Sequence, residues 1–230
     1  VSSQLRLYKD AALTLNGATV TADMVQIREN ATPTINIDNS TIKANSVENL
    51  SGATWNAVMD EDGYVTFVRT GLAGGGTEEN PYLINDISDL EFFRDQVNAG
   101  NTYAGKYIKL TDDIDLAVTR AINNWEPIGT QANPFKGTFD GDNNTISDLV
   151  INGGSSSNQG FFGMTRDGEI KNVIFENAKV SGRLNVGVVA GTPYTSKYTN
   201  IKVTGHVEVN GMAYVGGVGG KNAYANWTNI

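Results

Sequence analysis

The chain has 230 residues, of which 40% are hydrophobic, and its 25 acidic and 17 basic side chains give a formal charge of −8. This hydrophobic fraction supports a folded core, whereas the acidity argues against nucleic-acid binding, which needs clustered Lys and Arg. The absence of Cys excludes disulfides and thiolate chemistry. No stretch approaches the ~20 apolar residues of a transmembrane helix, so we expect no membrane span in this segment.

A short repeat occupies the N-terminal part of the chain. Residues 13–22 overlay residues 35–44, and in both copies apolar residues alternate with Thr, Asn or Lys around a small polar pair. This alternation predicts strand, turn and strand, and a repeat of this length indicates a solenoid. We therefore expect residues 1–70 to form β-helical coils with a period of about 22 residues. They should end with an acidic turn at 60–63 and a strand at 64–68.

A Gly-rich stretch at residues 71–80 follows and predicts a junction. One short α-helix is expected near residues 89–99, with Ser88 as its N-cap, Glu91 completing a capping box and Gly100 ending it in the left-handed conformation. Its apolar stripe consists of Leu90, Phe93 and Val97. We expect this helix to cover the solenoid.

A second repeat, 29 residues long, occupies the C-terminal third. Residues 185–191 fall on 214–220 with four identities, and residues 198–201 fall on 227–230 with three. Stacked coils would bury the inward Val, Ile, Leu and Phe, and the 26 Gly would supply positive φ at the corners. Because Ile230 aligns with the first strand of a coil, we expect the repeat to be incomplete at the C-terminus.

These patterns predict an all-β protein, a right-handed parallel β-helix (β-solenoid) with one short α-helix. Residues 81–230 form one β-helical region, and residues 1–70 either form a separate region or belong to one continuous solenoid.

From residue 76 onward the order of motifs resembles the GLUG-motif family of bacterial cell-surface β-helical proteins. The matching segments are Gly76–Ile84, Leu110–Leu116, Trp125–Gly129, Phe135–Gly141 and Val215–Gly220. The resemblance covers about two thirds of the chain and implies a β-helical module of large surface proteins, including adhesins. No catalytic residues belong to the motif, and residues 1–70 share no signature with it.

The segment from Asp140 to Asn144 resembles the opening of a Ca²⁺-binding loop, with Asp140, Asp142 and Asn144 as its ligands. The motif is incomplete, because Ile151 stands where a bidentate Glu should be. A turn between two strands is therefore favoured over a metal site. We therefore expect no cofactor, and Ca²⁺ at this loop is kept only as the less favoured alternative.

Aromatic residues suggest a binding surface. Tyr198 and Trp227 repeat at the 29-residue offset, so they should stack along the solenoid and serve its packing. Trp125, Tyr194 and Tyr224 lie in loops or at coil edges and are the candidate ligand contacts, although we expect Tyr194 and Tyr224 to repeat at this offset as well.

A carbohydrate-active β-helix enzyme, a polysaccharide lyase or hydrolase, would need carboxylates clustered on one face. The well-matched coils carry no recurring acid, and a catalytic triad is disfavoured because His206 is the single His and reads as a surface residue. The leading hypothesis is a non-catalytic, exported segment at the bacterial cell surface that binds a protein or glycan of a host or neighbouring cell. The enzyme and a passive stalk of a larger secreted protein remain alternatives. Function should be sought where the repeat is broken, around Trp125 and at residues 153–159.

Overall fold

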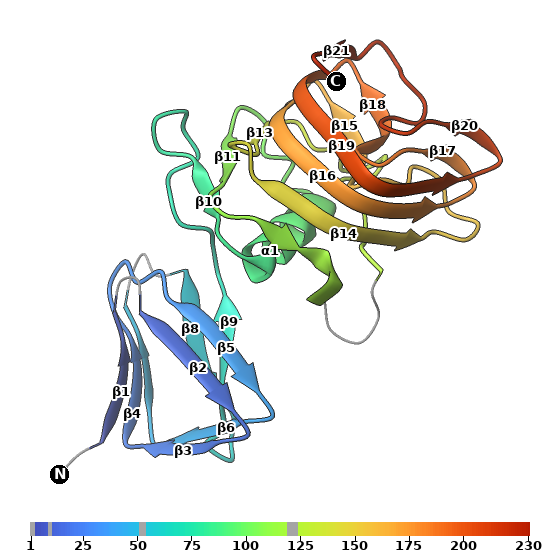
Figure 1. The fold of residues 1–230 in the computed structure, drawn as a ribbon. Helices are drawn as coiled ribbons and strands as arrows, with labels where there is room; N and C mark the ends of the chain where they lie inside the picture. The colour runs from blue at the N-terminus through green and yellow to red at the C-terminus, as the bar shows by residue number, and fades with distance from the viewer. Residues whose placement is uncertain (1–2, 9–10, 51–53, 119–123) are drawn as a thin grey trace. The chain divides into compact units, whose positions relative to one another are not determined.

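The computed structural model describes residues 3–8, 11–50, 54–118 and 124–230. The chain divides into two compact units, Val1–Ala73 and Gly74–Ile230, so the boundary falls inside the Gly-rich stretch (Figure 1). Parallel β-solenoid coils and, among the described residues, one α-helix confirm the predicted fold class. No described helix is long and apolar enough to cross a membrane.

The first unit consists of short strands that pair mostly in parallel. Its strands are β1 (Gln4–Leu7), β2 (Ala12–Asn16), β3 (Thr19–Ala22), β4 (Met24–Ile27), β5 (Thr34–Asp38), β6 (Thr41–Ala44), β7 (Val47–Asn49), β8 (Trp55–Met59) and β9 (Val65–Arg69). Three parallel sheets, β1-β4-β7, β2-β5 and β3-β6, form the sides of the coils. Leu13 pairs with Ile35 and Val20 with Ile42, which is the predicted 22-residue register.

The first unit ends differently from the repeat that precedes it. β8 and β9 form an antiparallel hairpin and not another parallel coil. Its acidic turn is closed by the Asp60 carboxylate, which accepts from the backbone N–H groups of Asp62 at 3.0 Å and Tyr64 at 2.8 Å. Gly63 completes the reversal at φ +80°. Glycine is favoured there because residues with a side chain rarely adopt a positive φ. The tight turn thus places β9 antiparallel to β8, whereas parallel strands of successive coils need a longer connection between them.

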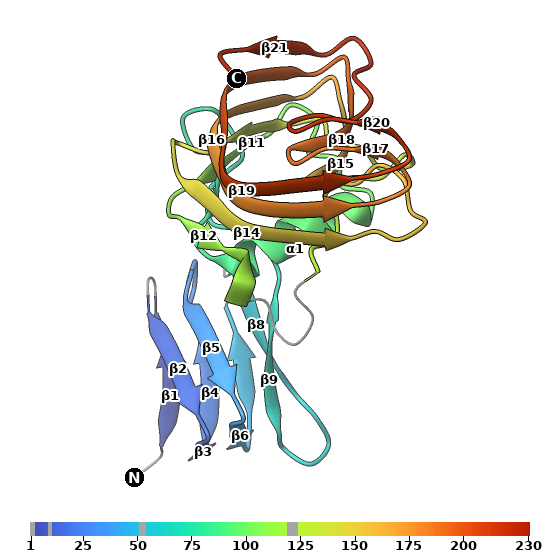
Figure 2. The same ribbon diagram turned by 45° about the vertical axis from the view of Figure 1, so that its right-hand side comes forward.

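The second unit is a taller stack of coils. Its elements are β10 (Tyr82–Ile84), α1 (Ile87–Asn98), β11 (Tyr107–Leu110), β12 (Ile114–Asp115), the 3₁₀ turn η1 (Leu116–Val118), β13 (Thr138–Asp140), β14 (Thr145–Asn152), β15 (Phe162–Arg166), β16 (Glu169–Ser181), β17 (Leu184–Val186), β18 (Ala190–Tyr194), β19 (Lys197–Asn210), β20 (Ala213–Val215) and β21 (Asn226–Thr228). All pairs among these strands are parallel, and β14, β16 and β19 stack on one side (Figure 2).

The 29-residue repeat is visible directly in the strand register. Tyr198 pairs with Trp227, and their rings stack with centroids 4.0 Å apart at 18°. Tyr198 is fully buried, so the predicted packing role of this aromatic pair is confirmed. Between β16 and β19 the register shifts by one residue after Glu176, close to Gly205 at φ +74°. This irregularity absorbs the difference in length between successive coils.

Helix α1 closes the aromatic core of the second unit. Its predicted stripe of Leu90, Phe93 and Val97 is fully buried, and the Phe93 ring lies 5.5 Å from Phe135 and 6.0 Å from Phe139. This packing confirms that the helix covers the coils. Gly100 follows the C-cap at φ +115°, as predicted.

The predicted N-cap of this helix was wrong. Asp86 caps the helix and accepts from the Asp89 N–H at 2.8 Å. The Asp89 carboxylate in turn accepts from the backbone and side chain of Asn85, each at 3.0 Å. Asp86 is thus the N-cap, two residues before the predicted Ser88, and the Asp89 carboxylate bonds back to Asn85, the residue before the cap.

The role predicted for the glycines is confirmed at some positions, such as Gly17 and Gly205, but not in the repeated segments 185–191 and 214–220, where no Gly has positive φ. Positive φ in these coils is adopted mainly by Asn and Asp, which tolerate the left-handed conformation. These residues are Asp142, Asn143, Asp148, Asn158, Asp167, Asn172, Asn177, Asn185, Asn200 and Asn229. Gly191 and Gly220 do not have positive φ; a Cβ would lie 2.4 Å from the Asn158 carbonyl carbon at Gly191 and 2.5 Å from the Val186 nitrogen at Gly220. Gly191 and Gly220 are required because neighbouring backbones approach too closely for a side chain.

Asparagine side chains line one corner of the solenoid. Asn229 donates to Asn200 at 2.6 Å, Asn200 to Asn172 at 2.9 Å, and Asn172 to Asp140 at 3.0 Å. Stacked amides of this kind bond successive coils through their side chains as well as their backbones. The Asn residues with positive φ at this corner therefore add side-chain hydrogen bonds between coils to those of the backbone.

Candidate functional site

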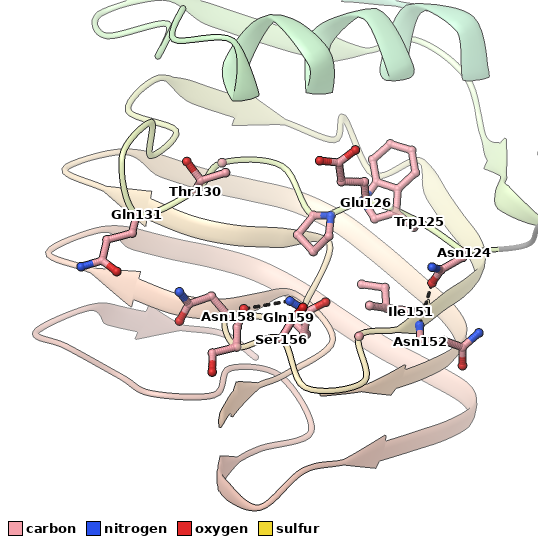
Figure 3. A pocket seen from close by; sticks show the side chains of 14 residues that line it. Asn124, Trp125, Glu126, Thr130, Gln131, Ile151, Asn152, Ser156, Asn158 and Gln159 are labelled. Atoms are coloured by element: carbon pink, nitrogen blue, oxygen red, sulfur yellow. Dashed lines mark hydrogen bonds between the residues drawn. The ribbon is translucent and has the colours of Figure 1, made fainter. Parts of the chain in front are cut away.

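A polar groove of about 560 Å³ interrupts the regular surface of the second unit. Two loops form its walls, residues 124–131 and residues 151–159, and the second follows β14 (Figure 3). Its lining residues are Asn124, Trp125, Glu126, Pro127, Gly129, Thr130, Gln131, Ile151, Asn152, Gly153, Ser156, Ser157, Asn158 and Gln159. The lining includes Trp125 and most of the 153–159 segment, the places where the sequence repeat is broken.

Backbone hydrogen bonds fix both walls to the coils. Trp125 donates to the Val150 carbonyl at 2.7 Å, and Asn158 donates to the Leu184 carbonyl at 2.9 Å. The Asn124 side-chain oxygen accepts from the Asn152 N–H at 2.7 Å and joins the two walls at one end (Figure 3). The groove is thus preformed in the fold.

Amide side chains dominate the floor and the rim. The Asn158 side-chain oxygen accepts from Asn185 at 2.7 Å and Thr192 at 2.8 Å, which orients its amide group. The Gln159 side chain, 7% exposed, donates to the Ser157 carbonyl at 2.8 Å. Three residues of the lining, Gln131, Asn152 and Ser156, are exposed to solvent and form its rim (Figure 3). Of the described lining residues, Glu126 alone carries a charge.

Trp125, a predicted ligand contact, belongs to the wall of the groove but is only 4% exposed. One ring face stacks on Phe161 at 5.4 Å and 4°, and the Arg94 guanidinium lies 4.9 Å from the ring centroid. The indole N–H donates to the Phe161 carbonyl at 3.2 Å. Trp125 therefore positions the 124–131 wall, and its ring faces are occupied by the protein.

Tyr194 and Tyr224, the other predicted contacts, lie away from the groove lining. Their rings meet edge to face at 6.3 Å, and Tyr224 is 82% exposed. The expectation that they repeat at 29 residues was wrong, because Tyr194 pairs with Ala223. Tyr224 instead has positive φ, 29 residues after Thr195, which also has positive φ. These tyrosines form a separate exposed aromatic pair.

The residues of the predicted Ca²⁺ site already have protein partners. Asp142 pairs with Lys109 at 2.9 Å, and Asp140 lies 3.5 Å from the Lys171 ammonium. The Asn144 side chain donates to the Leu110 carbonyl at 3.3 Å. The hydrogen bond that Lys109 donates to Asp142 raises the pKa of the Lys109 ammonium. Among the described residues no cluster of three or more acidic or His ligands could hold a metal ion.

A smaller hollow of about 270 Å³ brings together carboxylates and ammonium groups. Asp167 and Glu169 line it with Lys136 and Lys197. A glycosidase proton donor needs an apolar environment that keeps it protonated. Here two lysines share the hollow with the two acids, so its lining is charged and not apolar. His206 lies on an exposed stretch of β19 outside both cavities.

The fold and the groove define this chain as a parallel β-solenoid with a polar surface site. It is similar to halomucin of Haloquadratum walsbyi, with 38% identity over 126 residues that cover 52% of this chain and 1% of halomucin. It is also similar to a Gly-rich membrane protein of Evansella cellulosilytica, with 35% identity over 106 residues that cover 44% of this chain and 12% of that protein. No family model matches the chain. No solved structure matches it either.

Proposed function

We propose that this chain is a segment of a larger exported protein and acts, without catalysis, in adhesion at the cell surface. Its partner is a protein or glycan of a host or neighbouring cell. The observation that carries the proposal is the polar groove, which interrupts an otherwise regular ladder at two loops. The names of the two relatives, a halomucin and a membrane protein, support a surface association. The resemblance of residues 76–230 to the GLUG-motif family points the same way.

A binding role accounts for the groove better than a passive stalk does. A stalk needs only the stacked coils, and these could be joined by regular turns without irregular loops. The groove requires two irregular loops whose walls are fixed by specific bonds, such as the Asn124–Asn152 contact. Polar loops on a rigid scaffold are common sites of binding.

The enzyme alternative has less support from the same residues. Inverting and retaining glycosidases both use two carboxylates flanking the scissile bond. Among the described residues that line the groove, Glu126 carries the only carboxylate, and this residue is exposed. The pair in the smaller hollow shares it with two lysines. A non-catalytic role therefore remains the proposal.

Two measurements test this function. Antibodies raised against residues 1–230 should label intact cells of the producing organism, and beads coated with this segment should adhere to those cells or to cells from the same habitat. Beads coated with an unrelated acidic protein are the control, because the charge of −8 alone changes non-specific binding. Absence of labelling on intact cells, or equal adhesion of both kinds of beads, would refute the proposal.

A further inference from the structure

We infer that the groove between residues 124–131 and 151–159 binds an uncharged oligosaccharide through amide and hydroxyl groups. This inference rests on the proposed function and names the ligand class of its site. It follows from four features of the groove, namely its chemical lining, the state of Trp125, the fixed position of its walls and its charge.

The lining has the chemistry of a polyol site. Five residues with amide side chains, Asn124, Gln131, Asn152, Asn158 and Gln159, line the groove together with three that carry hydroxyls, Thr130, Ser156 and Ser157. A primary amide offers a donor and an acceptor side by side, and a hydroxyl can serve as either. Neighbouring hydroxyls of a sugar ring present the same alternation, so an oligosaccharide can bond to several of these groups at once. The volume lies within the roughly 300–1,000 Å³ of small-molecule sites.

The state of Trp125 determines how such a ligand is held. Phe161 and Arg94 occupy its ring, so the indole provides no open platform for a sugar face. Binding therefore depends on hydrogen bonds, each of which replaces a bond to water and adds little net affinity. We expect a dissociation constant of about 1 mM for one site. Many copies on a surface would convert such weak sites into firm attachment.

The walls are preorganised for this weak binding. Asn124 joins them at one end, and Asn158 is oriented by Asn185 and Thr192. Because these side chains are already ordered, ligand binding costs little conformational entropy, and the small free energy gained from the hydrogen bonds is retained.

Charge selects neutral sugars over acidic ones. Among the described lining residues Glu126 alone is charged, and the chain carries −8 overall. A uronate carboxylate in the groove would meet a like charge, and none of the described lining residues supplies a compensating cation. The ligand is therefore an uncharged oligosaccharide.

The test is a titration of the ¹⁵N-labelled protein followed by amide resonances. The probes are cellotetraose, chitotetraose and mannotetraose, with tetragalacturonate as the acidic comparison. At least one neutral probe should shift side-chain amide signals of the groove, Asn124 and Gln131 among them, whereas tetragalacturonate should not. The inference is overturned if no neutral probe shifts these signals, if the shifts map elsewhere, or if the acidic probe binds as well.

Matched variants locate the site. Gln131→Ala and Asn152→Ala on the rim should each weaken binding about fivefold, the loss expected for one hydrogen bond. Gln4→Ala and Asn36→Ala remove the same side chains from exposed strand positions of the first unit and should leave binding unchanged. Equal affinities in all four variants would contradict the assignment. Bead adhesion without any sugar-induced shift would overturn this inference alone and leave the proposed function standing.

Discussion

At the scale of single residues, the core of the second unit contains polar groups that bond to one another. The Tyr198 hydroxyl lies 2.7 Å from the Thr165 hydroxyl, and both residues are fully buried. Tyr198 also stacks on Trp227 in the next coil. Two coils are thus connected by a bond within the core in addition to their backbone ladder.

Removing one hydroxyl of this pair should cost more than removing both. Tyr198→Phe or Thr165→Val leaves the other hydroxyl buried without its partner, and each change should lower the free energy of unfolding by about 1–3 kcal/mol. The double variant should lose less than the sum, with a coupling of about 1 kcal/mol. Urea unfolding of the four proteins measures the cycle. Strictly additive losses would show that the two hydroxyls do not stabilise each other.

Alkaline pH should destabilise the second unit through its buried tyrosines. Burial raises the pKa of Tyr103 to about 12 and that of Tyr198 well above its usual value of 10.0. Above pH 10 the unfolded chain releases these protons while the folded chain retains them, so stability is complete below pH 10 and falls from there toward pH 12. Urea unfolding at pH 8, 10 and 11 should show this decrease. Tyr198→Phe should weaken the dependence, and an unchanged slope in that variant would contradict the assignment.

At the scale of elements, the distance between coils determines which glycines can be replaced. Gly191 and Gly217 both belong to the repeated Val/Gly segments, yet they differ in their surroundings. A Cβ at Gly191 would lie 2.4 Å from the Asn158 carbonyl carbon, whereas a Cβ at Gly217 would meet no atom within 4 Å. Neither has positive φ. The difference between them is therefore steric.

Gly191→Ala should lower the free energy of unfolding by about 1–3 kcal/mol, because two backbones must move apart. Gly217→Ala should leave stability unchanged or raise it by up to about 1 kcal/mol through the unfolded chain. Thermal unfolding of the two variants provides the comparison. Equal losses would mean that the conformation of glycine, and not the space around it, is what the repeat requires.

The element scale also shows what sequence could predict. Period, register and the buried face of α1 follow from local alternation and self-similarity, so Leu13–Ile35, Tyr198–Trp227 and Phe93 were predictable. The cap was missed because Asp86 and Ser88 are equally good capping residues, and only the fold decides between them. The groove combines loops 124–131 and 151–159, which share no period. Their irregularity marked the region, but the burial of Trp125 depends on contacts with distant residues.

At the scale of the molecule, each unit has a hydrophobic core of its own. In the first unit the core is formed by small aliphatic residues, with Val25, Ile27 and Ile42 at its centre. In the second unit aromatic residues dominate, including Phe135, Phe139 and Phe162. A short unit buries less of its surface on folding than a longer one, so its stability is lower. The two cores should therefore respond separately to heat and denaturant.

Separate unfolding can be tested with the fragments 1–73 and 74–230 beside the full chain. We expect the full chain to show two transitions in calorimetry, the lower one from the first unit. Fragment 74–230 should melt within about 3 °C of the upper transition, a shift no larger than ~1 kcal/mol would cause. The near-ultraviolet circular dichroism of fragment 74–230, dominated by its buried aromatic residues, should match that of the second unit in the full chain. One cooperative transition of the full chain, together with an unfolded 74–230 fragment, would contradict this expectation and favour one continuous solenoid.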